Sequence, residues 1–241
     1  MKYSLTSEHV IIDGKKLFRI KANQDFSDVE EGDLGGFVQS EQNLSQEGNC
    51  WIYDNALVYD NARLCGYAKV YDNAKVFNNA KVFDNARLYG YAMVFDNALV
   101  YDNAKVSGSA KVCDDAMVSG NAMVSDNAMV YDNAKVFDNA KVYGKALVYE
   151  NAKVYGKALV YGNALVYGYA LSYGHAEVPS KKHYVYVTKV VTKRCEVDND
   201  NYVKIEQASE DTYLASQTVL DDMFNKSNFI MSTGLSGLTT N

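Results

Sequence analysis

Histidine is the residue type of this chain best suited to acid–base chemistry near neutral pH. The sequence has three histidines, His9, His175 and His183. A catalytic base also needs an orienting partner and a pocket around its ring. His175 lies in the last unit of an uninterrupted repeat, which supplies no loop to build such a pocket. We therefore expect an exposed residue, and keep His175 as a general base as the less favoured alternative.

The four cysteines are the next candidates for chemistry. Cys50, Cys65, Cys113 and Cys195 form no CxxC pair and no metal-like spacing with the histidines, so we predict free thiols, no zinc site and no disulfide framework. No cofactor is implied by these residues.

A six-residue repeat from Trp51 to Ala176 forms the scaffold on which most of the candidate residues lie. Its 21 units follow one another without insertion or deletion, as in Lys69-Val70-Tyr71-Asp72-Asn73-Ala74. Alanine closes all 21 units, and the second position is Val, Leu or Ile in 20 of them. A period of six is neither that of a helix nor that of a flat sheet. It predicts a prism with one short strand and one corner per hexad, and three hexads per coil.

Within each hexad, we expect the aliphatic residue and the alanine to point inward and the residues flanking the aliphatic one to point outward. The remaining two residues form the corner. Twelve units place Asp, Glu or Asn first in this pair, and the other nine place Gly there. Each corner thus holds a residue that tolerates positive φ, and Gly is expected to adopt it where present.

This pattern resembles the hexapeptide-repeat, left-handed parallel β-helix superfamily. The resemblance implies an all-β fold of about seven to eight coils. It also implies a left-handed coil, because the family has this hand. Enzymes of this class are acyltransferases that use acyl-CoA and a histidine base between subunits of a trimer. The N-terminal part contains the segments Asp25–Val29, Gly32–Phe37 and Gly48–Trp51. Through these segments, residues 1–176 also resemble bacterial and phage hexapeptide-repeat proteins that are labelled transferases by fold alone. This resemblance implies a phage or prophage origin but no established catalytic residue.

The chain divides into three expected parts. Residues 1–32 form an N-terminal cap with a hairpin turning at Asp13-Gly14, and residues 33–176 form the β-helix. Running the hexad register backwards gives three degenerate units, Asp33–Val38, Gln39–Leu44 and Ser45–Cys50, with Leu34 and Val38 inward. Residues 177–241 form an α+β cap or small domain with strands at 184–191 and 202–206, a helix at 209–225 and a loose tail.

Hexads three apart share a corner or a face. One column therefore contains Asp60, Asn78, Asp96, Asp114, Asp132 and Glu150, but turn chemistry alone explains these residues and we predict no metal site.

One face carries an apolar and aromatic stripe that we take as the preferred subunit or partner interface. Its residues are Leu57, Tyr59, Phe77, Met93, Phe95, Met129, Tyr131, Leu147, Tyr149, Leu165 and Tyr167.

Four smaller residues, Ser107, Cys113, Ser119 and Ser125, replace aromatic residues once around the prism. This waist is either a docking groove or drift among the repeats. The hexads lack the threonines that an ice-binding face would need.

Charge and hydropathy narrow the function classes. The net charge is −6 and comes from the segments outside the hexads, so we expect no direct binding to nucleic acid. Acidic nucleic-acid mimicry by the caps is a further alternative. No signal peptide or membrane span is evident, which predicts a cytoplasmic protein, in the host cytoplasm if the chain is phage-encoded.

The favoured hypothesis is a non-enzymatic interaction or scaffold protein that presents its aromatic faces and caps to a protein partner, as a possible homodimer or homotrimer. The alternative is a homotrimeric acyl-CoA-dependent acyltransferase with His175 as base, for which acetyl-CoA is the expected cofactor.

Overall fold

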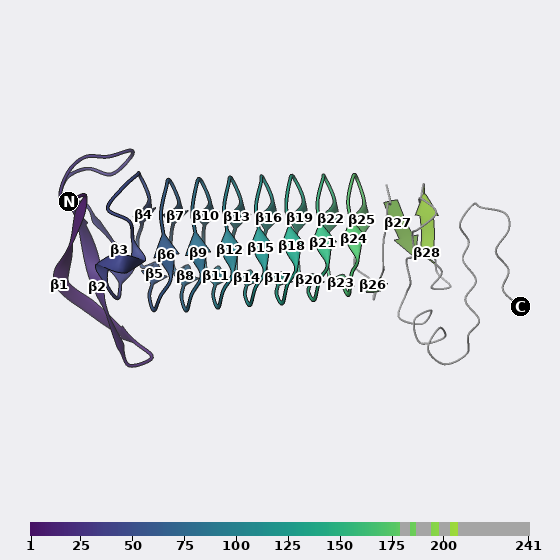
Figure 1. Cartoon of the computed structure of the whole chain (residues 1–241), viewed down its shortest axis with the longest axis horizontal. Helices are drawn as coiled ribbons and strands as arrows, with labels where there is room; N and C mark the ends of the chain where they lie inside the picture. The colour runs from purple at the N-terminus through teal and green to yellow at the C-terminus, as the bar shows by residue number, and fades with distance from the viewer. Residues whose placement is uncertain (179–183, 187–193, 198–202, 207–241) are drawn as a thin grey trace, which may run out of the picture.

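A long stack of triangular rungs follows an N-terminal hairpin (Figure 1). The computed structural model describes residues 1–178, 184–186, 194–197 and 203–206. Within these residues the structure is all-β apart from one short 3-10 helix, η1 (Glu41–Asn43). The prediction of an all-β, parallel β-helix with three hexads per coil is confirmed.

Three sheets, whose strands pair in parallel along the regular rungs, form the sides of the prism, and each is named by a distinguishing feature. The hairpin face contains the N-terminal hairpin. Its strands, in spatial order, are β1 (Tyr3–Ile12), β2 (Lys15–Ala22), β3 (Leu34–Val38), β5 (Leu57–Val58), β8 (Lys75–Val76), β11 (Met93–Val94), β14 (Lys111–Val112), β17 (Met129–Val130), β20 (Leu147–Val148), β23 (Leu165–Tyr167) and β26 (Tyr184–Tyr186).

The other two sides are the seven-stranded face and the eight-stranded face, counted over the described residues. The seven-stranded face contains β6 (Arg63–Leu64), β9 (Lys81–Val82), β12 (Leu99–Val100), β15 (Met117–Val118), β18 (Lys135–Val136), β21 (Lys153–Val154) and β24 (Leu171–Ser172). The eight-stranded face contains β4 (Trp51–Ile52), β7 (Lys69–Val70), β10 (Arg87–Leu88), β13 (Lys105–Val106), β16 (Met123–Val124), β19 (Lys141–Val142), β22 (Leu159–Val160) and β25 (Glu177–Val178).

Successive rungs pair in a constant register, each residue with its equivalent three hexads along the chain. Leu88 of β10 lies beside Val70 of β7 on one side and Val106 of β13 on the other. Parallel pairing places like residues in columns about 4.8 Å apart. An insertion inside a rung would break this register. The straight stack therefore requires a repeat without insertions or deletions.

The core is built from the two inward positions of each hexad. The alanines from Ala56 to Ala176 and the aliphatic residues between them are fully buried or nearly so. The one polar substitute, Ser172, is also buried, and its hydroxyl has no hydrogen-bond partner within the described residues. Alanine is required because the narrow prism leaves space for one large and one small side chain per hexad.

The corners confirm the predicted backbone conformation. Across residues 51–176, which the structure describes completely, the first corner residue of all 21 hexads has φ between +53° and +75°. Glycine adopts this conformation in nine units, as expected, and Asp, Asn or Glu adopts it in the other twelve. Short polar side chains tolerate the left-handed region better than most residues do.

The first coil departs from the predicted register. Val38 pairs with Val58 and Leu44 bridges to Leu64, so partners here lie farther apart along the chain than the three hexads of the later rungs. The expected inward position of Leu34 is wrong, since its side chain is 55% exposed, although Val38 is buried as predicted. A short insertion between Leu44 and Ile52 restores the regular register, because Trp51 again pairs with Lys69, three hexads ahead.

The N-terminal hairpin continues the hairpin face beyond the first coil. The predicted turn at Asp13-Gly14 is confirmed, with φ of +50° and +75°, and β2 pairs antiparallel with both β1 and β3. Lys2 is 4% exposed and donates hydrogen bonds to the carbonyl oxygens of Gly48 at 3.2 Å and Cys50 at 3.0 Å. The inserted segment of the first coil therefore holds the chain's first strand against the core.

A second anchor fixes the loop between β2 and β3 to the eight-stranded face. Asp28 accepts a hydrogen bond from the Tyr53 hydroxyl at 2.9 Å and forms an ion pair with Lys69. Partial burial by itself raises the pKa of Asp28, but the bonds from Lys69 and Tyr53 outweigh it and lower the pKa to about 2.

Beyond Val178 the structure describes three short strands, β26, β27 (Arg194–Val197) and β28 (Val203–Glu206). β26 and β28 fall within the strands predicted at 184–191 and 202–206. The helix predicted at 209–225 and the tail lie outside the described residues. Across the part of the chain that the structure describes, no helix has the length and apolarity needed to span a membrane.

Candidate functional site

Side-chain ladders along the corners are the most regular polar feature of the prism. Ten hexads of the regular repeat have Asp as the first corner residue, and in nine of them the carboxylate accepts a hydrogen bond from the backbone N–H of the equivalent corner residue one rung later. These contacts measure between 2.8 and 3.4 Å. The carboxylates thus stabilise the turns. Among the described residues, no three His, Cys, Asp or Glu side chains gather closely enough to hold a metal ion.

Asparagine at the second corner position forms a second ladder. Asn61 donates to Asn79, and Asn79 donates to Asn97, each at 3.1 Å. The Asn97 amide donates in turn to Asp115, again at 3.1 Å. These amides lie on the outside of the corner between the hairpin face and the seven-stranded face.

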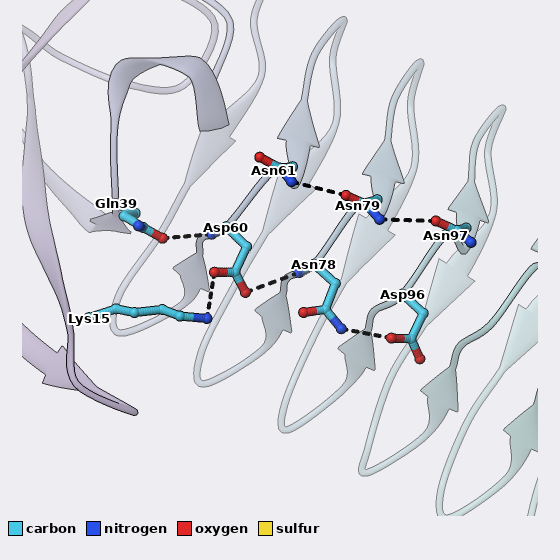
Figure 2. Close-up of a pocket in the computed structure, with 8 residues that line it drawn as sticks. All are labelled: Lys15, Gln39, Asp60, Asn61, Asn78, Asn79, Asp96 and Asn97. Carbon is cyan, nitrogen blue, oxygen red and sulfur yellow. Dashed lines mark hydrogen bonds and ion pairs between the residues drawn. The ribbon is translucent and has the colours of Figure 1, made fainter.

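A polar groove of about 540 Å³ lies along this corner (Figure 2). It is lined by Lys15, Gln39, Asp60, Asn61, Asn78, Asn79, Asp96 and Asn97. The repeat predicts the column of Asp60, Asn78 and Asp96, and the structure brings these three together. Sequence reasoning missed Lys15 and Gln39, because nothing in the local pattern places the hairpin tip and the first coil beside this corner.

Lys15 and Gln39 close one end of the groove around Asp60. The ammonium of Lys15 forms an ion pair with Asp60 at 2.5 Å and lies over the Tyr59 ring, 5.4 Å from its centre. Gln39 accepts the backbone N–H of Asp60 at 2.8 Å. Burial, with the nearby Asp13 and Asp60, raises the pKa of Tyr59 to about 12, so its hydroxyl stays neutral at physiological pH.

The predicted interface stripe occupies the hairpin face. Stacked rings 4.9–5.2 Å apart run through Tyr59, Phe77 and Phe95, and again through Tyr131, Tyr149 and Tyr167. Leu57 and Tyr59, at the N-terminal end, are buried against Leu17 of the hairpin and Phe37 of β3. The remaining predicted residues, Phe77, Met93, Phe95, Met129, Tyr131, Leu147, Tyr149, Leu165 and Tyr167, are half-buried along the face.

The waist interrupts the aromatic ladders on all three faces. Cys113 separates Phe95 from Tyr131 on the hairpin face, and Ser119 separates Tyr101 from Phe137 on the seven-stranded face. Burial raises the pKa of the Cys113 thiol to about 12, which makes it a weak nucleophile.

His175 lies in the last hexad and is exposed. Within the part of the chain that the structure describes, no hydrogen bond or ion pair orients its ring, and it lines neither this groove nor the smaller trough beside Arg87 and Lys105 on the eight-stranded face. Cys50 and Cys113 are buried and Cys65 is exposed, and these three cysteines are free thiols.

Comparison with known proteins agrees with this architecture. The YdcK β-solenoid repeat family matches residues 52–66 and 158–174. A 74-residue stretch is 43% identical to the uncharacterized acetyltransferase YdcK of Escherichia coli K12, covering 27% of this chain and 23% of YdcK. The match therefore spans about a quarter of that relative. The repeat of this chain is similar to the YdcK β-solenoid repeat, in agreement with the hexapeptide-repeat β-helix architecture of the structure.

Proposed function

We propose that the chain is a non-enzymatic binding protein that docks a protein partner on its hairpin face. The observation that carries this proposal is the distribution of charge among the three faces. At the outward position before the buried aliphatic residue, the regular rungs of the hairpin face have two lysines in seven, Lys75 and Lys111. The seven-stranded face has four basic residues in seven at the same position.

Protein interfaces are depleted in charge and enriched in aromatic residues and Met. The hairpin face combines Met93, Met129, Leu147 and Leu165 with two ladders of stacked rings. Such rings lose little side-chain entropy on binding because stacking already restricts them. A straight face held by continuous backbone bonds also presents its residues without rearrangement.

A paired substitution tests this face. Met129→Lys with Leu147→Lys places charges on adjacent rungs of the hairpin face, where Lys75 and Lys111 show that the fold accepts lysine. The matched control, Leu99→Lys with Met117→Lys, does the same on the seven-stranded face. We expect the first pair to weaken binding of a co-purifying partner, once that partner is purified, by more than about tenfold, because interface centres tolerate charge poorly. Equal binding by both pairs would overturn the assignment of this face.

The solution mass by light scattering decides what kind of partner is sought. A species near three times the mass of one chain would make other copies of this chain the first occupants of the face. A monomer would leave the face free for a different protein. A phage or prophage accessory role for such a protein rests on the resemblance of residues 1–176 alone.

The second candidate function is an acyl-CoA-dependent acyltransferase, and the name of the YdcK relative favours it. It would need a homotrimer with His175 as general base in a cleft between subunits. Acetyl transfer from acetyl-CoA that disappears in His175→Ala but persists in His9→Ala would support this candidate. Absence of acetyl-CoA binding at millimolar concentration would exclude it.

A further inference from the structure

The groove at the corner of the hairpin and seven-stranded faces has the properties of a ligand site. We propose that it binds a neutral glycan chain lying along the stack of rungs. The groove lies beside the hairpin face, but a ligand is inferred here from the corner residues alone, so neither proposal depends on the other.

The asparagine ladder offers the same pair of groups at each rung. An asparagine side chain has two N–H donors and two acceptor lone pairs. Asn79 uses one donor toward Asn97 and one lone pair toward Asn61. One N–H and one lone pair therefore remain on Asn79 without a partner among the described residues, and Asn97 is placed in the same way by its bond to Asp115.

A hydroxyl group both donates and accepts, so a polyhydroxylated chain matches this array. The ladder bonds also hold the amides in fixed orientations before a ligand arrives, which lowers the entropic cost of binding. Asn78 strengthens the match, since it is the one first-corner residue among the 21 hexads that is Asn, and it donates to Asp96 at 2.7 Å. An aspartate in its place would add a third carboxylate between Asp60 and Asp96.

The charge of the groove argues against an anionic ligand. Lys15 is its one basic lining residue and is already paired with Asp60. Asp96 then leaves the lining with a net charge of −1, from one basic and two acidic residues. Phosphate-bearing ligands such as acyl-CoA and acidic polysaccharides would be repelled, whereas a neutral glycan would not.

The spacing of the rungs separates a glycan from a peptide. Rungs repeat about every 4.8 Å, whereas an extended peptide advances about 3.4 Å per residue and falls out of step within two rungs. A pyranose ring advances its chain by a length close to one rung, so successive sugars can meet equivalent amides. Lys15 and Gln39 close one end of the groove, which would fix where the chain stops (Figure 2).

Binding of cellotetraose and of the β-linked N-acetylglucosamine tetramer to the full chain tests this proposal. We expect at least one tetramer to bind and to shift the side-chain amide NMR signals of Asn79 and Asn97. Asn79→Ala should weaken that binding about tenfold, because it removes two hydrogen bonds and interrupts the ladder. Asn139→Ala is the matched control, since Asn139 accepts from Asn121 at 3.2 Å in another ladder outside the groove.

Three outcomes would overturn the proposal. The first is that neither tetramer binds at millimolar concentration to a chain that melts normally. The second is binding that Asn79→Ala and Asn139→Ala weaken equally, which would place the sugar elsewhere. The third is tighter binding of a neutral glycine–serine octapeptide than of either tetramer, which would make the groove a peptide site.

Discussion

Replacement of a corner aspartate separates the two contributions that hold each turn of the prism. Asp102 has φ of +57°, and its carboxylate accepts the backbone N–H of Gly120 at 3.0 Å. Asp102→Gly removes the hydrogen bond but keeps a residue suited to positive φ. Asp102→Ala removes the hydrogen bond and also forces a residue with a Cβ into the left-handed region.

The magnitudes follow from these two terms. The hydrogen bond contributes about 1 kcal/mol, less than is usual for a bond to a charged group because Asp102 is exposed. The left-handed conformation costs alanine about 1–2 kcal/mol, of which aspartate avoids part. We expect Asp102→Ala to cost about 2 kcal/mol and Asp102→Gly about 1 kcal/mol.

The assay combines the thermal midpoint of the whole chain with amide hydrogen exchange at Gly120. Solenoids can unfold in parts, so a local probe is needed beside the global one. Gly120 should exchange faster in both variants, whereas the midpoint should fall further in Asp102→Ala. Asn103→Ala is the control and should change stability by less than about 0.5 kcal/mol, because Asn103 is exposed and outside the left-handed region. Equal midpoints for the Ala and Gly variants would refute the argument that backbone conformation selects the corner residue.

Three further predictions concern the core, the thiols and the N-terminal anchor. Ala104→Leu should destabilise the prism by about 3 kcal/mol or more in a thermal melt, because Ala104 is fully buried beside stacked rungs that cannot move apart; a stable, folded variant would contradict the packing argument. At pH 8, iodoacetamide should modify Cys65 well before Cys113, whose pKa burial raises to about 12, and mass spectrometry showing the reverse order would be inconsistent with this burial. The pKa of Asp28 is lowered to about 2, so its ion pair with Lys69 stabilises the fold at pH values above the ordinary aspartate pKa near 4, and this stabilisation is lost as the pH falls toward 2. The stability difference between the natural chain and Asp28→Asn should therefore shrink over that pH range. A difference independent of pH would argue against the ion pair.

The regular rungs could be predicted from sequence because each hexad repeats the same local structural preferences. Val or Leu beside a small residue fixes which side chains are inward, and the Gly or Asp at the corner fixes the turn. Twenty-one consistent repetitions leave no competing register. The same register alone places His175 in a corner, and the structure shows it exposed there.

The first coil and the groove could not be predicted, since their geometry depends on contacts between distant segments. Gly36 precedes Val38 by two residues, as Ala56 precedes Val58, so a glycine fills an alanine position and the sequence there lacks the alanine that marks a hexad. The insertion between Leu44 and Ile52 changes the pairing offset between the first coil and the next, so extending the regular hexads backwards gives the wrong register there. Lys15 reaches Asp60 because the hairpin packs Leu17 against Leu57 and Tyr59, a contact with no signature in either segment.

The purity of the repeat also limits which residues carry functional information. Val, Ala, Asp, Gly and the stacked rings recur because the prism requires them, so their presence at any one rung says little about a ligand. Departures from the pattern are different, since the fold does not demand them. Asn78 in place of aspartate is such a departure, and two contacts from outside the regular repeat, the pairing of Lys15 with Asp60 and the bond from Asp60 to Gln39, fall on the same corner. These three features meet within one groove, and their convergence is the strongest argument for a ligand site at this corner.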